Sequence, residues 1–102
     1  MKVLYVEDDP RDADLTLHIL RRTAPHLLFE TVSTIQEASG RIQRTDADPI
    51  DLVLTDMHLR DGDGLSLLNY IRENALPLAV VIVTGVGDED TAVAALKARA
   101  DD

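Results

Sequence analysis

Four short apolar runs recur along the chain, and each is followed by a segment with helical spacing. The runs begin near residues 3, 27, 50 and 79. They are continuous rather than alternating, which is typical of strands buried on both faces of a parallel sheet. Parallel neighbours need crossover connections, and helices are the usual crossovers. The pattern therefore predicts an α/β fold with a doubly wound parallel sheet, and 102 residues leave room for one domain.

The first helical segment carries a clear start signal. Asp9 and Pro10 are typical of an N-cap and of the first residue of a helix. Ala13, Leu17 and Leu20 then recur on one helical face. This predicts a helix that packs on the sheet directly after the first strand, and Pro25 predicts that it has ended before that residue.

The later helices are predicted in the same way. Thr34 and Glu37 match a capping box. The helix that follows would place one apolar stripe on the sheet, made of Ile35, Ala38 and Ile42. A turn-rich stretch at 60–64 leads to a further helix, whose apolar residues at helical spacing are Leu65, Leu68 and Ile71. A last helix is expected from residue 91 to about 98.

The fourth apolar run, 79–84, is the most β-branched segment of the sequence. That composition is typical of a buried central strand. At the spacing of the first four runs, a fifth strand would begin just beyond Asp102. We therefore expect a domain over 1–102 that is truncated at its C-terminal end, with the fifth βα unit missing and no second domain.

Charge and composition exclude several classes of function. Ten basic against 19 acidic side chains give a formal net charge of −9, which argues against a nucleic-acid partner and favours cations or basic protein surfaces. The sequence has no cysteine, so it offers no disulfide and no thiolate metal site. No apolar run has the length of a membrane helix. A cytoplasmic protein without a membrane partner is expected.

Acidic and hydroxyl side chains follow three of the predicted strands. In open α/β sheets, the carboxyl ends of the strands form the functional edge. Carboxylates that converge there repel one another unless a cation or a proton neutralises them. Oxygen ligands without sulfur or paired histidines suit Mg²⁺ or Mn²⁺. The residues expected at this edge are Glu7, Asp8, Asp9, Asp56, Thr84 and Gly85.

Four motifs in the same order resemble the receiver, or phosphoacceptor, domain of two-component response regulators. They are Val6 to Pro10, Leu52 to Leu59, Asp63 with Gly64, and Val81 to Gly85. The resemblance extends over the whole chain. It implies a flavodoxin-like sheet with strand order 2-1-3-4-(5), and a signalling role in a phosphorelay rather than that of an enzyme.

The resemblance also assigns roles to individual residues. Asp56 would accept a phosphoryl group from a histidine kinase or a phosphotransfer protein and relay it as a conformational change. The metal ligands would be Glu7, Asp8, Asp56 and the backbone carbonyl of His58. Thr84 would donate a hydrogen bond to the phosphoryl group and act as a switch, and Gly85 would leave room for that group.

The sequence departs from the family pattern at two places. Arg60 stands four residues after the phosphoacceptor, where the family usually carries proline. The family's lysine and aromatic switch residue on the fifth strand would both fall beyond Asp102. Without that strand, the apolar edge at Val80 to Val83 would be open, so we expect self-association through the fourth strand.

Two other functions are compatible with these residues. One is a phosphatase that resembles the haloacid dehalogenases, which also form an aspartyl phosphate with Mg²⁺. That family carries Asp-x-Asp on its first strand, whereas this sequence has Asp56, Met57 and His58 after its third. The other is a pseudo-receiver that acts only through protein contacts.

The side chain of His58 has two interpretations. It could influence hydrolysis of the phosphoryl group, or it could be an exposed loop residue without a role.

Overall fold

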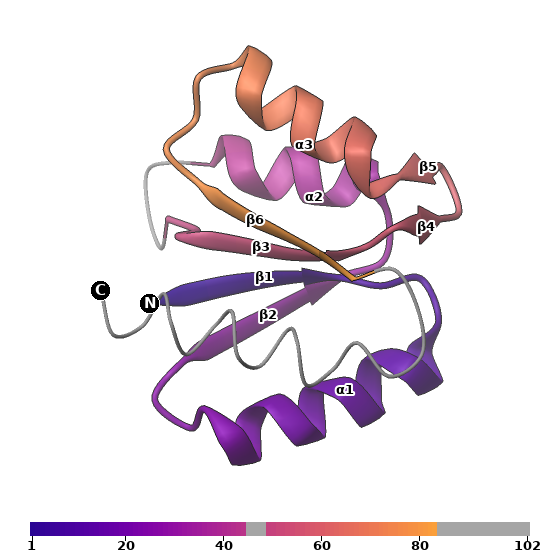
Figure 1. Cartoon of the computed structure of the whole chain (residues 1–102), viewed down its shortest axis with the longest axis vertical. Helices are drawn as coiled ribbons and strands as arrows, with labels where there is room; N and C mark the ends of the chain where they lie inside the picture. The colour runs from indigo at the N-terminus through magenta and orange to yellow at the C-terminus, as the bar shows by residue number, and fades with distance from the viewer. Residues whose placement is uncertain (45–48, 84–102) are drawn as a thin grey trace.

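The computed structural model describes residues 1–44 and 49–83 (Figure 1). Its strands are β1 (Lys2–Val6), β2 (Leu28–Val32), β3 (Leu52–Asp56), β4 (His58–Leu59), β5 (Gly62–Asp63) and β6 (Ala79–Val83). Its helices are α1 (Pro10–Thr23), α2 (Ile35–Gln43) and α3 (Gly64–Glu73). The four predicted strands and the first three predicted helices are confirmed, and the helix expected over 91–98 lies outside the described residues. No helix in the described ranges combines the length and apolarity that crossing a bilayer requires.

The main sheet has the strand order β2-β1-β3-β6, and all three pairings are parallel. Because β6 is the fourth apolar run, this confirms the predicted order 2-1-3-4. Within the described residues, β6 lies at the edge of the sheet and is half-buried along its length. The prediction of a buried central strand is therefore wrong for the described sheet, because β6 has β3 on one side alone.

The central strand β1 supplies both cores. Val3 and Tyr5 pack on the face covered by α1. Leu4 and Val6 pack on the opposite face, which α2 and α3 cover (Figure 1). Strand side chains alternate between faces, so a run with helices on both sides must be apolar throughout. This explains why the first apolar run is continuous.

Each described helix begins with a side-chain cap at the carboxyl edge of the sheet. Asp9 accepts a hydrogen bond from an α1 backbone amide at 2.9 Å, as predicted from the Asp-Pro pair. Thr34 accepts one from α2 at 3.1 Å, which confirms the first half of the capping box. Asp63 accepts one from α3 at 2.8 Å. These bonds satisfy amides that have no partner within their helices.

The buried face of α3 differs from the predicted one. Leu67 and Ile71 are buried, whereas Leu65 is 48% exposed and Leu68 is only half-buried. Residues 64, 67 and 71 share a helical face when the helix begins at Gly64. Of the three apolar residues named for this helix, Leu65 lies just outside the buried face, and Leu67 is buried in its place.

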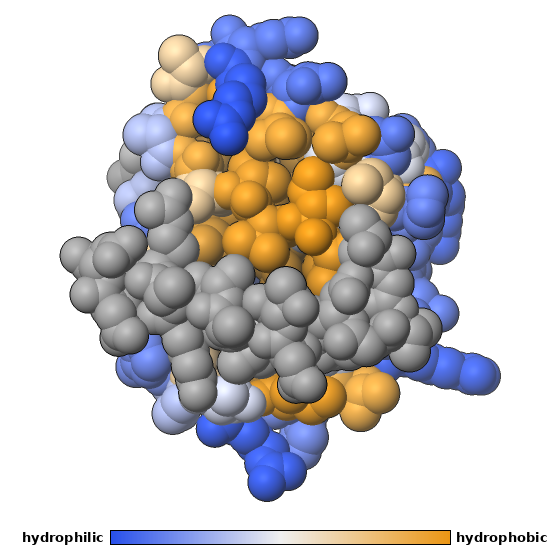
Figure 2. Space-filling model, viewed as in Figure 1, coloured by the Kyte–Doolittle hydropathy of each residue, from blue (hydrophilic) through white to orange (hydrophobic). Residues whose placement is uncertain are grey.

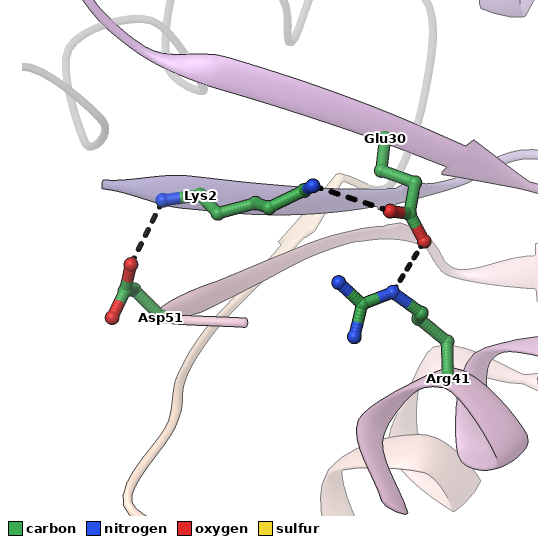
Figure 3. A network of polar contacts seen from close by, with 4 residues as sticks. All are labelled: Lys2, Glu30, Arg41 and Asp51. Carbon is green, nitrogen blue, oxygen red and sulfur yellow. Dashed lines mark hydrogen bonds and ion pairs between the residues drawn. The ribbon is translucent and has the colours of Figure 1, made fainter. Parts of the chain in front are cut away.

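A network of polar contacts connects β1, β2 and the residue before β3 with helix α2 (Figure 3). The Glu30 carboxylate on β2 contacts Arg41 Nε on α2 at 2.6 Å and Lys2 Nζ on β1 at 3.5 Å. The Lys2 backbone amide donates to Asp51, just before β3, at 2.8 Å. Arg41 is almost completely buried, and a buried guanidinium requires such partners. The network therefore anchors α2 on the face of the sheet.

An apolar surface is visible over β6 in the space-filling view (Figure 2). Its half-buried residues pack against both cores, Val80 against one and Val81 and Val83 against the other. Leu76 and Leu78, on the segment that leads into β6, are also half-buried and pack against the same core as Val80. The self-association expected at this strand stays a prediction.

Candidate functional site

Three acidic side chains meet where β1 and β3 end. Val6 pairs with Thr55 in the sheet, so the residues that follow them, Glu7 and Asp56, emerge side by side. Glu7, Asp8 and Asp56 each offer one carboxylate oxygen, and these three atoms lie within 4.8 Å of one another. All three residues are half-buried. The structure thus brings together three of the side chains that the sequence predicted at this edge.

Asp9, the fourth acid considered at this edge, has a different role. Its carboxylate accepts the hydrogen bonds of the Arg11 and Asp12 amides and caps α1. Its own backbone amide donates to Glu7 Oε1 at 3.1 Å. Asp9 therefore orients the Glu7 carboxylate while its own charge stays at the helix end.

The environment of Glu7 favours its protonated form. Burial, followed by the charges of Asp56 and Asp8, raises the pKa of Glu7 to about 7, and the hydrogen bond from the Asp9 amide opposes this rise. A carboxyl whose pKa is raised by neighbouring carboxylates gains from a nearby cation. The metal-free cluster is therefore electrostatically strained near neutral pH.

The backbone around Asp56 is tightly held. The amide of Met57 donates to Val83 O at 2.9 Å, and the amide of Gly64 donates to Met57 O at 2.8 Å. A Cβ atom at Gly64 would lie only 2.9 Å from the Asp56 carbonyl oxygen. Glycine at 64 thus allows the start of α3 to approach the strand end that carries Asp56, which gives the Asp-Gly motif a structural reason.

The remaining predicted site residues differ in how far the structure places them. His58 is exposed, begins β4 and pairs with Asp63 of β5 in an antiparallel hairpin. Its backbone carbonyl was expected to bind the metal, and it lies two residues beyond Asp56. Thr84 and Gly85 lie outside the described residues.

Sequence reasoning missed the contacts of Asp61. Both of its carboxylate oxygens accept hydrogen bonds from the first backbone amides of α2. The one signal in the sequence is the alternation of Asp and Gly at 61–64, which is typical of a turn. That signal fits the hairpin but gives no indication of the helix that the turn contacts.

The donor set fits a hard divalent cation. Glu7, Asp8 and Asp56 supply oxygen atoms only, and the cluster includes no sulfur and no imidazole. Mg²⁺ prefers such carboxylate oxygens in proteins, and Mn²⁺ accepts the same ligands. Three converging carboxylates also need a counter-charge, which a divalent cation would supply.

Comparisons with known proteins agree with this geometry. The model of the response regulator receiver domain matches residues 3–102. The response regulator protein PilR of Pseudomonas aeruginosa is 39% identical over 103 residues, which cover 99% of this chain and 22% of PilR. The transcriptional regulatory protein DcuR of Shigella flexneri is 29% identical, with 89% of this chain and 38% of DcuR covered. The chain thus spans less than half the length of these relatives.

Solved structures match the fold as well. The MaeR response regulator bound to beryllium trifluoride has a TM-score of 0.72 and 26% identity, with 94% of this chain and 76% of that chain covered. The receiver domain of a Luxo repressor protein from Vibrio parahaemolyticus has a TM-score of 0.71 and 30% identity, with 94% and 70% covered.

Sequence motifs, sheet order and acidic cluster therefore agree with one family. The match favours the receiver interpretation over the phosphatase alternative, which required an Asp-x-Asp pair on the first strand. Receiver domains are signalling domains and not conventional enzymes. The chain belongs to the response regulator receiver domain family.

Proposed function

We propose that Asp56 accepts a phosphoryl group from a phosphohistidine on a sensor histidine kinase or phosphotransfer protein, in a step that depends on Mg²⁺ or Mn²⁺. The observation that carries this proposal is the position of Asp56 at the end of β3, where its carboxylate lies within 4.8 Å of those of Glu7 and Asp8. The proposal places the chain in the cytoplasm, which agrees with a sequence that has no cysteine.

The chemistry is a transfer between two nucleophiles. A carboxylate oxygen of Asp56 attacks the phosphorus atom, an oxygen–phosphorus bond forms, and the nitrogen–phosphorus bond of phosphohistidine breaks. The bonding electron pair stays on the imidazole nitrogen, which takes a proton from water. A carboxylate nucleophile needs no general base, because it has no proton to lose when it attacks.

The other residues bind and position. Glu7 and Asp8 would hold the cation together with Asp56 and the backbone carbonyl of His58. When bound, the cation neutralises negative charge on the carboxylates and the phosphoryl oxygens. Thr84 would donate a hydrogen bond to the phosphoryl group, and Gly85 would leave space for it.

The relay begins at a strand end. Phosphorylation replaces the single negative charge of the Asp56 carboxylate with a phosphoryl group that carries a charge of about −1.5 to −2 near pH 7 and three acceptor oxygens. The adjacent residue, Met57, donates its amide to Val83 O at the end of β6. A phosphoryl group on Asp56 therefore acts first on the end of β6, from which a change in packing can reach an output domain or target protein.

The test is phosphorylation by a small donor. We expect acetyl phosphate with Mg²⁺ to add one phosphoryl group, detected by intact-protein mass spectrometry, and EDTA to prevent it. Asp56→Asn should abolish the addition. Asp14→Asn, which removes an exposed charge on α1, should leave it unchanged. Continuous release of phosphate would instead indicate a phosphatase, and the absence of any addition would indicate a pseudo-receiver.

A further inference from the structure

The hairpin that follows Asp56 is anchored to a helix from another part of the chain. Asp61 lies in the turn between β4 and β5. Its Oδ1 accepts a hydrogen bond from the Ile35 amide at 2.9 Å, and its Oδ2 accepts one from the Gln36 amide at 3.0 Å. One carboxylate thus binds both of the first two amides of α2.

These two bonds complete the capping of α2. The Thr34 hydroxyl accepts from the amide of Glu37, and the Thr34 carbonyl accepts from that of Ala38. The amides of the first helical turn have no carbonyl partner within the helix, so Asp61 binds those of Ile35 and Gln36, which Thr34 does not reach. The Ile35 hydrogen bond, with that of Gln36, lowers the pKa of Asp61, which keeps the carboxylate charged beside the positive end of the helix.

Two further contacts hold the same hairpin. Leu59 of β4 is buried in the core beneath α2 and α3. Gly62 has a φ of +152°, and a Cβ atom there would lie 2.7 Å from Ile35 Cδ1. The hairpin therefore contacts the first residue of α2 through both the Asp61 side chain and the Gly62 backbone.

The hairpin is too short to be stable alone. It contains two residue pairs, His58 with Asp63 and Leu59 with Gly62. Isolated two-stranded hairpins are marginal in water even when they are longer. The position of the His58 backbone thus depends on contacts outside the hairpin, where Asp61 supplies the polar contacts to α2 and Asp63 those to α3.

We propose that Asp61 is a positioning residue of the phosphoacceptor site, which anchors the hairpin on α2 and so fixes the His58 carbonyl beside Asp56. The inference rests on the proposed function, in which that carbonyl is a metal ligand. Groups that orient metal ligands from outside the first coordination sphere typically change metal affinity by about 10- to 100-fold when they are removed. Loss of the anchor should therefore weaken Mg²⁺ binding.

The experiment compares two caps of one helix. Asp61→Ala removes the anchor, whereas Thr34→Ala removes the other cap of α2 and leaves the hairpin untouched. Mg²⁺ affinity is measured by calorimetry on the unphosphorylated chain. We expect a dissociation constant raised about tenfold in Asp61→Ala and unchanged in Thr34→Ala. Asp61→Glu, which keeps the charge on a longer arm, should recover part of the affinity.

Hydrogen exchange in metal-free buffer provides a second readout. Asp61→Ala should speed exchange of the hairpin amides at 58–63, and Thr34→Ala should affect only the first turn of α2. Equal effects of both variants on Mg²⁺ affinity, or a hairpin that exchanges at the wild-type rate in Asp61→Ala, would overturn the proposal.

The outcomes also separate this proposal from the proposed function. A wild-type chain that binds Mg²⁺ but is never phosphorylated contradicts the proposed function alone. A phosphorylated wild type with an unchanged Asp61→Ala contradicts only the role of Asp61. A wild-type chain that does not bind Mg²⁺ contradicts both. If Asp61→Ala does not fold, Asp61→Asn, which keeps the side-chain volume and one acceptor oxygen, takes its place in both measurements.

Discussion

Replacing Asp56 by asparagine should stabilise the metal-free protein while it abolishes phosphorylation. Asn has nearly the same shape as Asp but carries no charge. The carboxylates of Glu7 and Asp8 lie within 4.8 Å of that of Asp56, so the substitution removes two repulsions at once. The phosphoacceptor residue is therefore expected to lower the stability of the fold when no cation is bound.

The size of the gain follows from the distance. Two unit charges 4.8 Å apart repel by about 0.9 kcal/mol in bulk water and by about 3.5 kcal/mol at an effective dielectric constant of about 20. The three side chains are half-buried, and solvent and salt screen them. We therefore expect Asp56→Asn to raise the free energy of unfolding by about 1 to 2 kcal/mol.

The gain should depend on pH in a defined direction. The pKa of Glu7 is raised from 4.5 to about 7, chiefly by burial. Below about pH 4.5 Glu7 is protonated in both states, and above about pH 7 it is ionised in both. Between these values the folded chain holds a proton that the unfolded chain releases, so the stability contributed by Glu7 is lost as pH rises. The effect of Asp56→Asn should thus be largest above pH 7.

The assay is urea unfolding in EDTA at about pH 8 and about pH 5.5, at constant ionic strength. Asp14→Asn is the matched control, because it also changes the net charge from −9 to −8 but lies exposed on α1. If both substitutions stabilise the protein equally, the gain comes from the change in net charge and not from the carboxylate cluster. An Asp56→Asn protein less stable than wild type at both pH values would refute the clustering of the carboxylates.

Four further predictions concern the metal, a glycine at the site, a glycine within α2 and the polar network. Mg²⁺ at about 100 times its dissociation constant should add about 2.7 kcal/mol to the stability of the wild type, and a melting temperature that stays flat across a titration would contradict the site. Gly64→Ala should destabilise by about 1 to 3 kcal/mol and slow phosphorylation of Asp56, because the new Cβ would lie 2.9 Å from the Asp56 carbonyl oxygen. Gly40→Ala, with no atom within 4 Å of the new Cβ, should stabilise by about 0.5 to 1 kcal/mol when measured in the same urea series. Glu30→Gln should cost about 1 to 3 kcal/mol through its ion pairs at 2.6 and 3.5 Å, whereas the exposed Glu73→Gln should change little, and equal values for the two would argue against the network.

Much of the fold was predictable because its signals are local. The continuous run at β1 indicated burial on two faces, and the Asp9 and Thr34 caps lie next to the helices that they begin. The carboxylate cluster was also predictable, because parallel strands place their carboxyl ends at one edge of the sheet. Glu7 directly follows β1, and Asp56 is the last residue of β3. In these cases a tertiary contact follows from secondary structure alone.

The missed features depend on contacts between distant segments. The Asp61 carboxylate binds amides 25 and 26 residues earlier, and nothing in the turn sequence identifies that helix. Glu30 is the one charged residue of β2, and its partner Arg41 lies on the next helix. Leu67 is buried and Leu65 is exposed because of the residue at which α3 begins. The close approach of Gly64 to β3 determines that starting point.

The separation of Asp61 from α2 along the chain also bears on the order of folding. Thr34 can cap α2 as soon as that helix nucleates, because the hydroxyl and its amide partner are three residues apart. Asp61 contacts Ile35 only when a loop of 26 residues has closed, which carries an entropic cost. We therefore expect the first two amides of α2 to stay hydrated until late in folding. The helix acquires its last backbone partners at the same time as the loop beside the phosphoacceptor takes its shape.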